Sequence, residues 1–423
     1  MEKEILKVIE QKEREVASLC SELIKRKSEN PPGDVSEAAF FVRDLLKEWG
    51  LDVKTVEPER GRVNVVAILK GHGEKKLLFN GHLDVVPAGD PKNWKYDPYE
   101  GRISGGIVYG RGACDMKGAI ASMLTTLSVI LEKDVKLGGD LIFHFVCDEE
   151  TGGQFGTGYL AREGYVSADG CIIGEGSGNS VLGYTLVVAE RGVIWAKIKA
   201  KGRAAHGSVP MLGDNAILKL MRVIDVIRTL PDMELRIDPE IERLAESSME
   251  YLGPFMRAYK IDPEDFKRNM LRMSVNVGVV RGGTKVNVVP EYAEAEIDVR
   301  VPPSVSLEEA INLLRDRIEG TGVPGVELEL MATSEPSYQD VSHPFVNFVR
   351  RCVEEVTGRS VPLIMMPWST DARYIRNLGI PTVMLGPLNE SPHMANEYVP
   401  IRDLVMCAKM YALIALRFLG HEA

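Results

Sequence analysis

Histidine and carboxylate side chains stand at or near the ends of several short apolar runs in this sequence. The run LLFNGHLDVV, for example, passes from three apolar residues through an asparagine and a glycine to a histidine and an aspartate. A buried strand usually ends in a plain polar turn, so repeated endings of this kind need a chemical reason. The side chains that share this placement, or stand just before a helix, are His82, Asp84, Asp115, Glu149, Glu150, Glu175 and His393.

The residue types in this set are those that bind divalent metal ions. Imidazole and carboxylate without thiolate suit Zn²⁺ and related ions. If Asp84 and one of the adjacent glutamates have other roles, two histidines and three carboxylates remain as ligands. That number exceeds the three protein ligands usual for one catalytic zinc, and it fits two ions that share a bridging carboxylate. Asp84 would then support His82, because a carboxylate beside a metal-bound histidine fixes its orientation. Glu149 and Glu150 are adjacent, so one can bind metal while the other acts as general base.

Each residue taken singly is a weak signal, and the hypothesis depends on the conjunction of all of them. A lone histidine after a strand, or a pair of glutamates in a turn, is usually an ordinary surface feature. The segment GEGSGN, residues 174–179, resembles a dinucleotide-binding glycine loop, but the apolar VLGYTLVV that follows it indicates a strand where that motif requires a helix. P-loop, H-E-x-x-H and G-x-S-x-G motifs are absent from the sequence.

The apolar patterns around these residues predict the elements that position them. Short, dense apolar runs such as VVAIL, LLF and DLIFHFVC are typical of strands buried on both faces, which favours a mainly parallel α/β sheet. Ligand sites in such sheets form at the carboxyl ends of the strands, where these runs deliver their polar residues. The segments 38–50 and 401–419 have the apolar spacing of helices.

A different pattern begins near residue 187. The segments VVAERGVIWAKIKAKG and EYAEAEIDVRVP alternate apolar and polar residues, as half-exposed antiparallel strands do, and NVVP is predicted as a further short strand. Two helical segments, AILKLMRVIDVIRTL and SLEEAINLLRDRIEG, complete an α+β module. We therefore predict a catalytic α/β domain formed by residues 1–186 and 334–423, interrupted by a smaller inserted domain at 187–333.

The amino-acid composition limits the classes of protein to which this chain can belong. The 423 residues are 45% hydrophobic, which is enough for a large core and more than one domain. A formal net charge of -10 argues against nucleic-acid and anionic-membrane partners, and no apolar stretch reaches the ~18 residues of a membrane span. The charged N-terminus, MEKEILKVIEQKEREV, is predicted as one amphipathic helix rather than a signal peptide. Six scattered cysteines indicate a reducing, cytoplasmic location.

The motifs also resemble a known family when they are taken together. GHLDVVPAGD, GRGACDMKGA, CDEETGG, HGSVP and GPLNESPHMANE resemble the motifs of the dizinc amidohydrolases, which include acetylornithine deacetylase, succinyl-diaminopimelate desuccinylase, aminoacylase-1 and bacterial glutamate carboxypeptidase. The resemblance extends over most of the chain. It implies two Zn²⁺ ions per chain, for which Co²⁺ can substitute, and an inserted domain that serves as a lid and forms a homodimer.

The resemblance assigns the metal ligands one by one. It implies that His82 and Glu175 hold one zinc and that Glu150 and His393 hold the other. It implies that Asp115 bridges the two ions and that the peptide bond following Asp115 is cis.

The remaining site residues follow from the same resemblance. It implies that Glu149 is the general base that later protonates the leaving amine, and that Asp84 supports His82. His206, in AAHGSVP, matches the residue that reaches into the partner subunit's site and stabilises the oxyanion. Arginine offers a planar fork to a substrate carboxylate. The positions that match substrate-binding residues are Asn287, Arg300, Ser369, Thr370 and Arg373.

The implied activity is zinc-dependent hydrolysis of the amide bond of an N-acyl amino acid. DVVPAGD, GRGACDMKG and GPLNES are closer to the desuccinylase than to the deacetylase. A dipeptidase or carboxypeptidase with the same dizinc centre is the alternative within the class. An inactive protein that keeps the fold to bind a metabolite is the alternative from another class, and the intact Glu149 and full ligand set argue against it. The chain departs from the family in having Gly-Glu-Gly around Glu175, where many members have Gly-Glu-Pro, and in an apparent insertion at 232–272.

Overall fold

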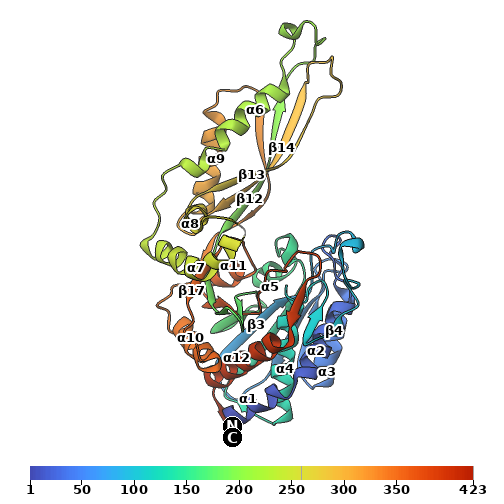
Figure 1. Cartoon of the computed structure of the whole chain (residues 1–423), viewed down its shortest axis with the longest axis vertical. Coiled ribbons are helices and arrows are strands. Elements are labelled where there is room, and N and C mark those ends of the chain that lie inside the picture. Colours follow the sequence, from blue (N-terminus) through green and yellow to red (C-terminus); the bar gives the residue numbers. More distant parts are fainter. Residues whose placement is uncertain (259, 423) are drawn as a thin grey trace. The chain divides into compact units, whose positions relative to one another are not determined.

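The chain folds into two compact units, as a computed structural model shows for residues 1–258 and 260–422 (Figure 1). Unit 1 comprises Met1–Val188, Gln339–Leu363 and Thr370–Ala423. Unit 2 comprises Ala189–Tyr338 and Ile364–Ser369.

Unit 1 is built on a sheet with a parallel centre and antiparallel edges. In spatial order its strands are β1 (Asp52–Val56), β2 (Asn64–Leu69), β7 (Asp140–Val146), β3 (Lys76–His82), β8 (Gly170–Ile173), β18 (Thr382–Met384) and β11 (Leu186–Glu190). Neighbours from β7 to β18 are parallel, whereas β1, β2 and β11 pair antiparallel. β7 and β3 are buried along almost their whole length, as dense apolar runs require. The predicted mainly parallel α/β sheet is confirmed.

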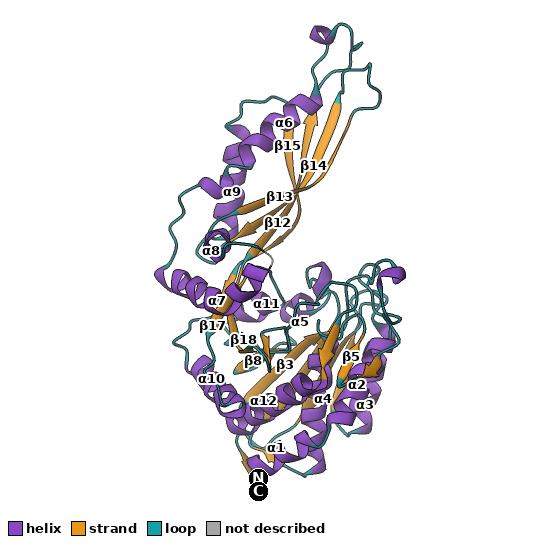
Figure 2. Cartoon of the chain, viewed as in Figure 1, coloured by secondary structure: helices purple, strands orange, loops and turns teal. Residues whose placement is uncertain are grey.

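Helices surround this sheet, some packed on its strands and others on neighbouring helices (Figure 2). They are α1 (Glu2–Glu10), α2 (Glu13–Lys25), α3 (Ser36–Glu48), α4 (Lys117–Glu132), α5 (Thr157–Arg162), α10 (Pro344–Thr357), α11 (Ala372–Arg376) and α12 (Ile401–Leu419). α4 and α12 pack together and against β3, and α3 packs on β1 and β2. The predicted helices at 38–50 and 401–419 are therefore confirmed as α3 and α12.

The N-terminal segment contradicts one expectation, because it forms two helices instead of one. Ile5 and Ile9 are buried on α1. The next position of that apolar stripe would be residue 12 or 13, where the sequence has Lys12 and Glu13. The chain breaks there and starts α2, whose buried face begins at Val16.

Smaller sheets complete unit 1. They consist of β19 (Tyr398–Pro400), β5 (Ile107–Tyr109) and β4 (Arg102–Ser104); of β20 (His421–Glu422) and β6 (Lys136–Leu137); and of β10 (Gly183–Tyr184) and β9 (Gly178–Asn179). The segment after GEGSGN thus forms short strands, in agreement with its exclusion as a dinucleotide loop.

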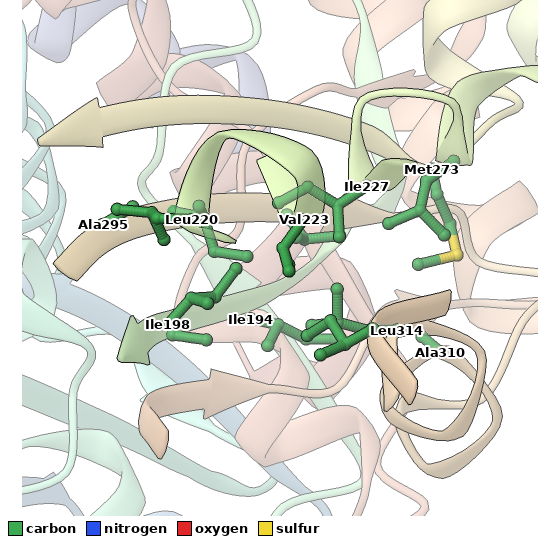
Figure 3. Close-up of a cluster of buried hydrophobic side chains, with 14 of the residues drawn as sticks. Ile194, Ile198, Leu220, Val223, Ile227, Met273, Ala295, Ala310 and Leu314 are labelled. Carbon is green, nitrogen blue, oxygen red and sulfur yellow. The ribbon is translucent and has the colours of Figure 1, made fainter. Parts of the chain in front are cut away.

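Unit 2 is an antiparallel sheet with helices on one face. Its strands lie in the order β13 (Ser274–Gly282), β14 (Tyr292–Val301), β12 (Gly192–Lys201) and β15 (Val326–Ser334). Alternation along β12 and β14 sends apolar side chains to one face, where they meet α6 (Ala216–Ile227) and α9 (Leu307–Glu319). Figure 3 shows part of this core, with Ile194, Ile198 and Ala295 from the sheet and Leu220, Val223 and Leu314 from the helices.

The segment NVVP is not a strand, so that prediction was wrong. Asn287 lies in a turn closed by a hydrogen bond from the Val288 N–H to the Lys285 carbonyl. The segment makes only an isolated bridge between Val288 and His206. The segment follows a glycine-containing stretch and ends in a proline. It is too short to form a ladder of hydrogen bonds with a neighbouring strand.

The segment 232–272, read from the sequence as an insertion, contributes α7 (Pro239–Ala258) and α8 (Pro263–Met270) to unit 2. The short strands β16 (Ser337–Tyr338) and β17 (Leu363–Met366) complete the elements. Within the described part of the chain, no helix combines the length and the apolar character that crossing a membrane requires.

Candidate metal centre

Strand order in unit 1 brings the predicted metal-binding residues to one edge of the sheet. His82 is the last residue of β3, Glu150 lies in the turn after β7, and Glu175 follows β8. His393 lies on the segment after β18. Because these strands are parallel neighbours, their carboxyl ends meet at the same edge, which is where ligand sites form in such sheets.

Asp115, just before α4, lies between the two histidines. Its Oδ1 is 3.0 Å from Nε2 of His82, and its Oδ2 is 3.1 Å from Nε2 of His393. Oε1 of Glu175 lies 3.2 Å from the same His82 nitrogen, and Oε2 of Glu150 lies 3.3 Å from the same His393 nitrogen. The side chains form two groups that share Asp115, and within each group the ligand atoms lie within 4.8 Å of one another. The expected cis peptide bond after Asp115 is present.

The electrostatics of these groups fit a site for cations. Burial, reinforced by the charge of Asp115, raises the pKa of Glu150 to about 7. Hydrogen bonds to Asp115 and Glu150 raise the pKa of His393 to about 10. Burial opposes the charged form of Asp115, but hydrogen bonds to His393 and His82 hold its pKa below the usual value. The negative charge of the carboxylates therefore stabilises positive charge in the space between them.

One oxygen of Glu150 gives an independent indication of a ligand. Its Oε1 is buried and has no hydrogen-bond partner among the residues that the structure describes. An unpaired buried carboxylate oxygen is costly unless a cation or other partner satisfies it. The donor set of imidazole and carboxylate, without thiolate, is that of zinc and similar divalent ions.

Asp84 connects the predicted ligand His82 to the turn that carries both glutamates. Its carboxylate is fully buried and accepts the N–H groups of Glu149 and Glu150, each at 3.1 Å. Nδ1 of His82 lies 2.8 Å from the main-chain oxygen of Asp84 and 3.6 Å from Oδ1. Asp84 thus contacts the histidine ring through its main chain and holds the Glu149–Glu150 turn through its side chain. Nδ2 of Asn30 donates a further hydrogen bond to Asp84 at 2.8 Å.

Glu149 stands beside the metal-binding groups without belonging to either of them. Burial, followed by the negative charge of Glu175, raises the pKa of Glu149 well above its usual value. A carboxyl group with a raised pKa is suited to accept and return a proton near neutral pH.

The predicted substrate-binding residues of unit 1 are buried. Arg373 donates a hydrogen bond to the Gly152 carbonyl at 2.6 Å and another to the Thr370 carbonyl. The Thr370 hydroxyl contacts the sulfur of Met384 at 3.2 Å. Arg373 therefore holds the loop that follows Glu149 and Glu150, and substrate binding by Arg373 and Thr370 stays a prediction.

The other predicted residues belong to unit 2. His206 is exposed, and its Nδ1 lies 2.7 Å from the Ser208 hydroxyl. Its loop adjoins that of Asn287, whose carbonyl accepts the Gly207 N–H at 2.8 Å.

Two further residues of unit 2 make contacts within that unit. Nε of Arg300 lies 2.9 Å from Oδ1 of Asp298. Ser369 lies 3.1 Å from Ser334 through their hydroxyl oxygens. The roles of His206, Asn287, Arg300 and Ser369 remain predictions.

Sequence reasoning missed two buried residues that support the site, Asn30 and Glu397. Asn30 lies 54 residues before Asp84 in the chain, so no local pattern connects them. Glu397 immediately precedes β19 and is fully buried. Two signals were available for Glu397: it stands at the entry to the partly buried strand β19, and it ends the motif GPLNESPHMANE.

The fold and this cluster of side chains define a metallohydrolase. The chain belongs to peptidase family M20/M25/M40, whose family model matches residues 78–417. It is similar to succinyl-diaminopimelate desuccinylase of Xanthobacter autotrophicus, with 29% identity over 412 residues that cover 96% of this chain and 100% of the relative.

Solved structures are similar over nearly the whole chain. An M20 family metallo-carboxypeptidase of Sulfolobus solfataricus superposes with a TM-score of 0.83 at 21% identity, covering 96% of this chain and 99% of that one. The dipeptidase Dug1p of Saccharomyces cerevisiae superposes with a TM-score of 0.81 at 17% identity, covering 99% and 98%. At these identities the solved structures establish the fold.

Proposed function

We propose that this protein is a two-zinc hydrolase that cleaves the amide bond of an N-acyl amino acid. The observation that carries the proposal is the placement of Asp115 between two histidines, each with its own glutamate, beside the separate Glu149. The similarity to a desuccinylase over 96% of the chain supports it. The complete set of side chains argues against an inactive binding protein.

The chain's own residues supply the proton transfers. When bound, the two zinc ions would polarise the substrate carbonyl and lower the pKa of a water molecule. Glu149 accepts the proton of the attacking water and later delivers it to the departing amine. The carboxylate of Asp84 keeps Glu149 in place by accepting the main-chain N–H of Glu149. Arg300 and Arg373 are the candidates for binding a substrate carboxylate, because arginine offers two parallel donors.

The substrate is proposed as an N-succinyl amino acid, with an N-acetyl amino acid or a dipeptide as the alternatives. The desuccinylase relatives favour the first, and the carboxypeptidase and dipeptidase structures keep the peptide alternative open. Turnover of N-succinyl, N-acetyl and dipeptide substrates with added Zn²⁺ or Co²⁺ tests the proposal. We expect the highest kcat/KM with an N-succinyl amino acid. If only dipeptides are hydrolysed, the protein is a peptidase and not a deacylase.

We further propose that the enzyme is a cytoplasmic homodimer formed through unit 2, and that His206 stabilises the oxyanion in the partner's site. Large apolar side chains are exposed on unit 2, which supports an interface there; they are Met211, Leu212, Leu218, Met221 and Val286. The six cysteines are buried and free of disulfides, which supports a reducing compartment.

A further inference from the structure

Glu397 is a fully buried carboxylate whose two oxygens are both occupied by N–H donors. Its Oε1 accepts the main-chain N–H groups of Cys114 at 2.8 Å and Asp115 at 3.0 Å. Its Oε2 accepts the N–H of Gly112 at 3.0 Å and the guanidinium of Arg111 at 2.5 Å. The donors thus come from one short segment that ends at the proposed bridging ligand, Asp115.

The same contacts tie that segment to the chain around the second histidine. Glu397 stands four residues after His393, and its carbonyl accepts the N–H of Gly110 at 2.9 Å. Arg111, itself 2% exposed, donates at 3.3 Å to the carbonyl of Met394, which adjoins His393. The loops that carry Asp115 and His393 are therefore joined by a buried ion pair and by main-chain hydrogen bonds.

We propose that Glu397 is a positioning residue of the metal centre, which sets the main chain of Asp115 against the His393 loop so that one carboxylate reaches both ions. This inference rests on the proposed two-metal site. Glu397 does not bind metal, because its oxygens are already taken by N–H donors. A glutamine cannot replace it, because the amide NH₂ would face N–H groups and leave Arg111 without a buried counter-charge.

The test is the zinc affinity of Glu397→Gln in the full-length protein, measured by competition with a chromophoric chelator. Outer partners of metal ligands typically contribute ~10–100-fold to metal affinity. We expect a loss of this size in at least one of the two sites. We also expect an altered visible absorption spectrum of the Co²⁺-loaded variant, because the geometry at Asp115 changes.

Asp140→Asn is the matched control for a general loss of stability. Asp140 is also a buried carboxylate, and it accepts the Lys70 ammonium at 2.9 Å and the Gly71 N–H at 3.1 Å. It begins β7, at the end of the strand remote from the metal site. We expect Asp140→Asn to lower the unfolding temperature while zinc affinity and the Co²⁺ spectrum stay those of the wild type.

Four results are decisive. Wild-type zinc affinity and Co²⁺ spectrum in Glu397→Gln would overturn the proposal, and so would equal losses of affinity in Glu397→Gln and Asp140→Asn. If Glu397→Gln does not fold, Glu397→Asp decides, since it keeps the charge but shortens the reach; wild-type affinity in that variant would also overturn the proposal. A wild-type protein that binds no zinc would instead refute the proposed metal centre itself.

Discussion

Glu149 and Glu150 are neighbours in the chain, yet their surroundings give them different chemistry. Glu150 Oε2 faces His393 at 3.3 Å, and its other oxygen is buried without a partner among the described residues. Glu149 lies outside both ligand groups and has a pKa raised by burial and by the charge of Glu175. The sequence left open which of the pair is the base, and only the resemblance assigned it.

The pair can be separated by mutation. Glu149→Gln should lower kcat by the ~10²–10⁴-fold typical for loss of a general acid-base, with zinc content near that of the wild type. Glu150→Gln should lose zinc, because it removes a ligand. Steady-state kinetics and elemental analysis of both variants are the measurements. If Glu149→Gln loses zinc and Glu150→Gln keeps it, the two roles are reversed.

A second residue-scale prediction concerns His144, in the middle of β7. It is fully buried, and burial lowers its pKa to about 4 from the usual 6.5. The unfolded chain therefore binds more protons than the folded protein between these pH values. The contribution of neutral His144 to the free energy of unfolding is complete above pH 6.5 and is lost as the pH falls towards 4. The separation of the two pKa values corresponds to roughly 3 kcal/mol.

Chemical unfolding of metal-free protein between pH 4 and 7 measures this effect. The fall in unfolding free energy at acid pH should be smaller in His144→Leu than in the wild type. His72 is exposed and offers a control, in which His72→Gln should follow the wild-type profile. A His144→Leu profile parallel to the wild type would exclude His144 as the source of acid sensitivity.

At the scale of elements, the metal-binding residues can be predicted because each strand that leads to one of them is recognisable as an apolar run in the sequence. β3 and β7 are dense apolar runs whose last or next residues are polar, and the parallel order brings those ends together. Features that depend on distant partners could not be predicted in this way. Glu397 meets Asp115 across 282 residues, and the role of Asn30 likewise depends on a remote contact with Asp84.

The segment 232–272 is a further case in which only the structure shows the contacts. The Ser248 hydroxyl of α7 is fully buried, accepts the Met365 N–H at 2.9 Å and contacts the Met365 carbonyl at 3.1 Å. It also donates to the carbonyl of Leu244, one turn earlier in α7, at 2.7 Å. The helix therefore holds main-chain groups of β17, the strand that precedes the predicted substrate-binding residue Ser369 in the chain.

Removing this hydroxyl should destabilise the protein. Ser248→Ala removes the side-chain acceptor of the buried Met365 N–H, and loss of such a buried hydrogen bond costs ~1–3 kcal/mol. The neighbouring Ser247 is only half-buried, so Ser247→Ala is the matched control and should be near neutral. Urea unfolding of both variants is the measurement. Equal stabilities would show that α7 does not hold β17 through Ser248.

At the scale of the whole molecule, the proposed chemistry needs residues from both units. The proposed metal ligands and Glu149 belong to unit 1, whereas His206 belongs to unit 2. The resemblance assigns His206 to the partner's site, so the proposed mechanism requires a homodimer. Removal of one oxyanion donor typically costs ~10²–10³-fold in kcat.

Subunit mixing tests whether His206 acts in the partner's site. His206→Ala and Glu149→Gln should each be nearly inactive. In a heterodimer of the two, use of the partner's His206 creates one site with both residues intact, so activity should return towards half of that of a wild-type dimer. Use within the same subunit leaves every site defective. No recovery in a mixture that mass spectrometry shows to contain heterodimers would refute the assignment to the partner's site.

The central claim is that two metal ions held through Asp115 are required for amide hydrolysis. The most direct test is the rate of hydrolysis of an N-succinyl amino acid as zinc is added back to exhaustively chelated protein. We predict no hydrolysis without metal, and full activity once about two Zn²⁺ or Co²⁺ ions are bound per chain. Full activity in protein shown by elemental analysis to be metal-free would contradict the account.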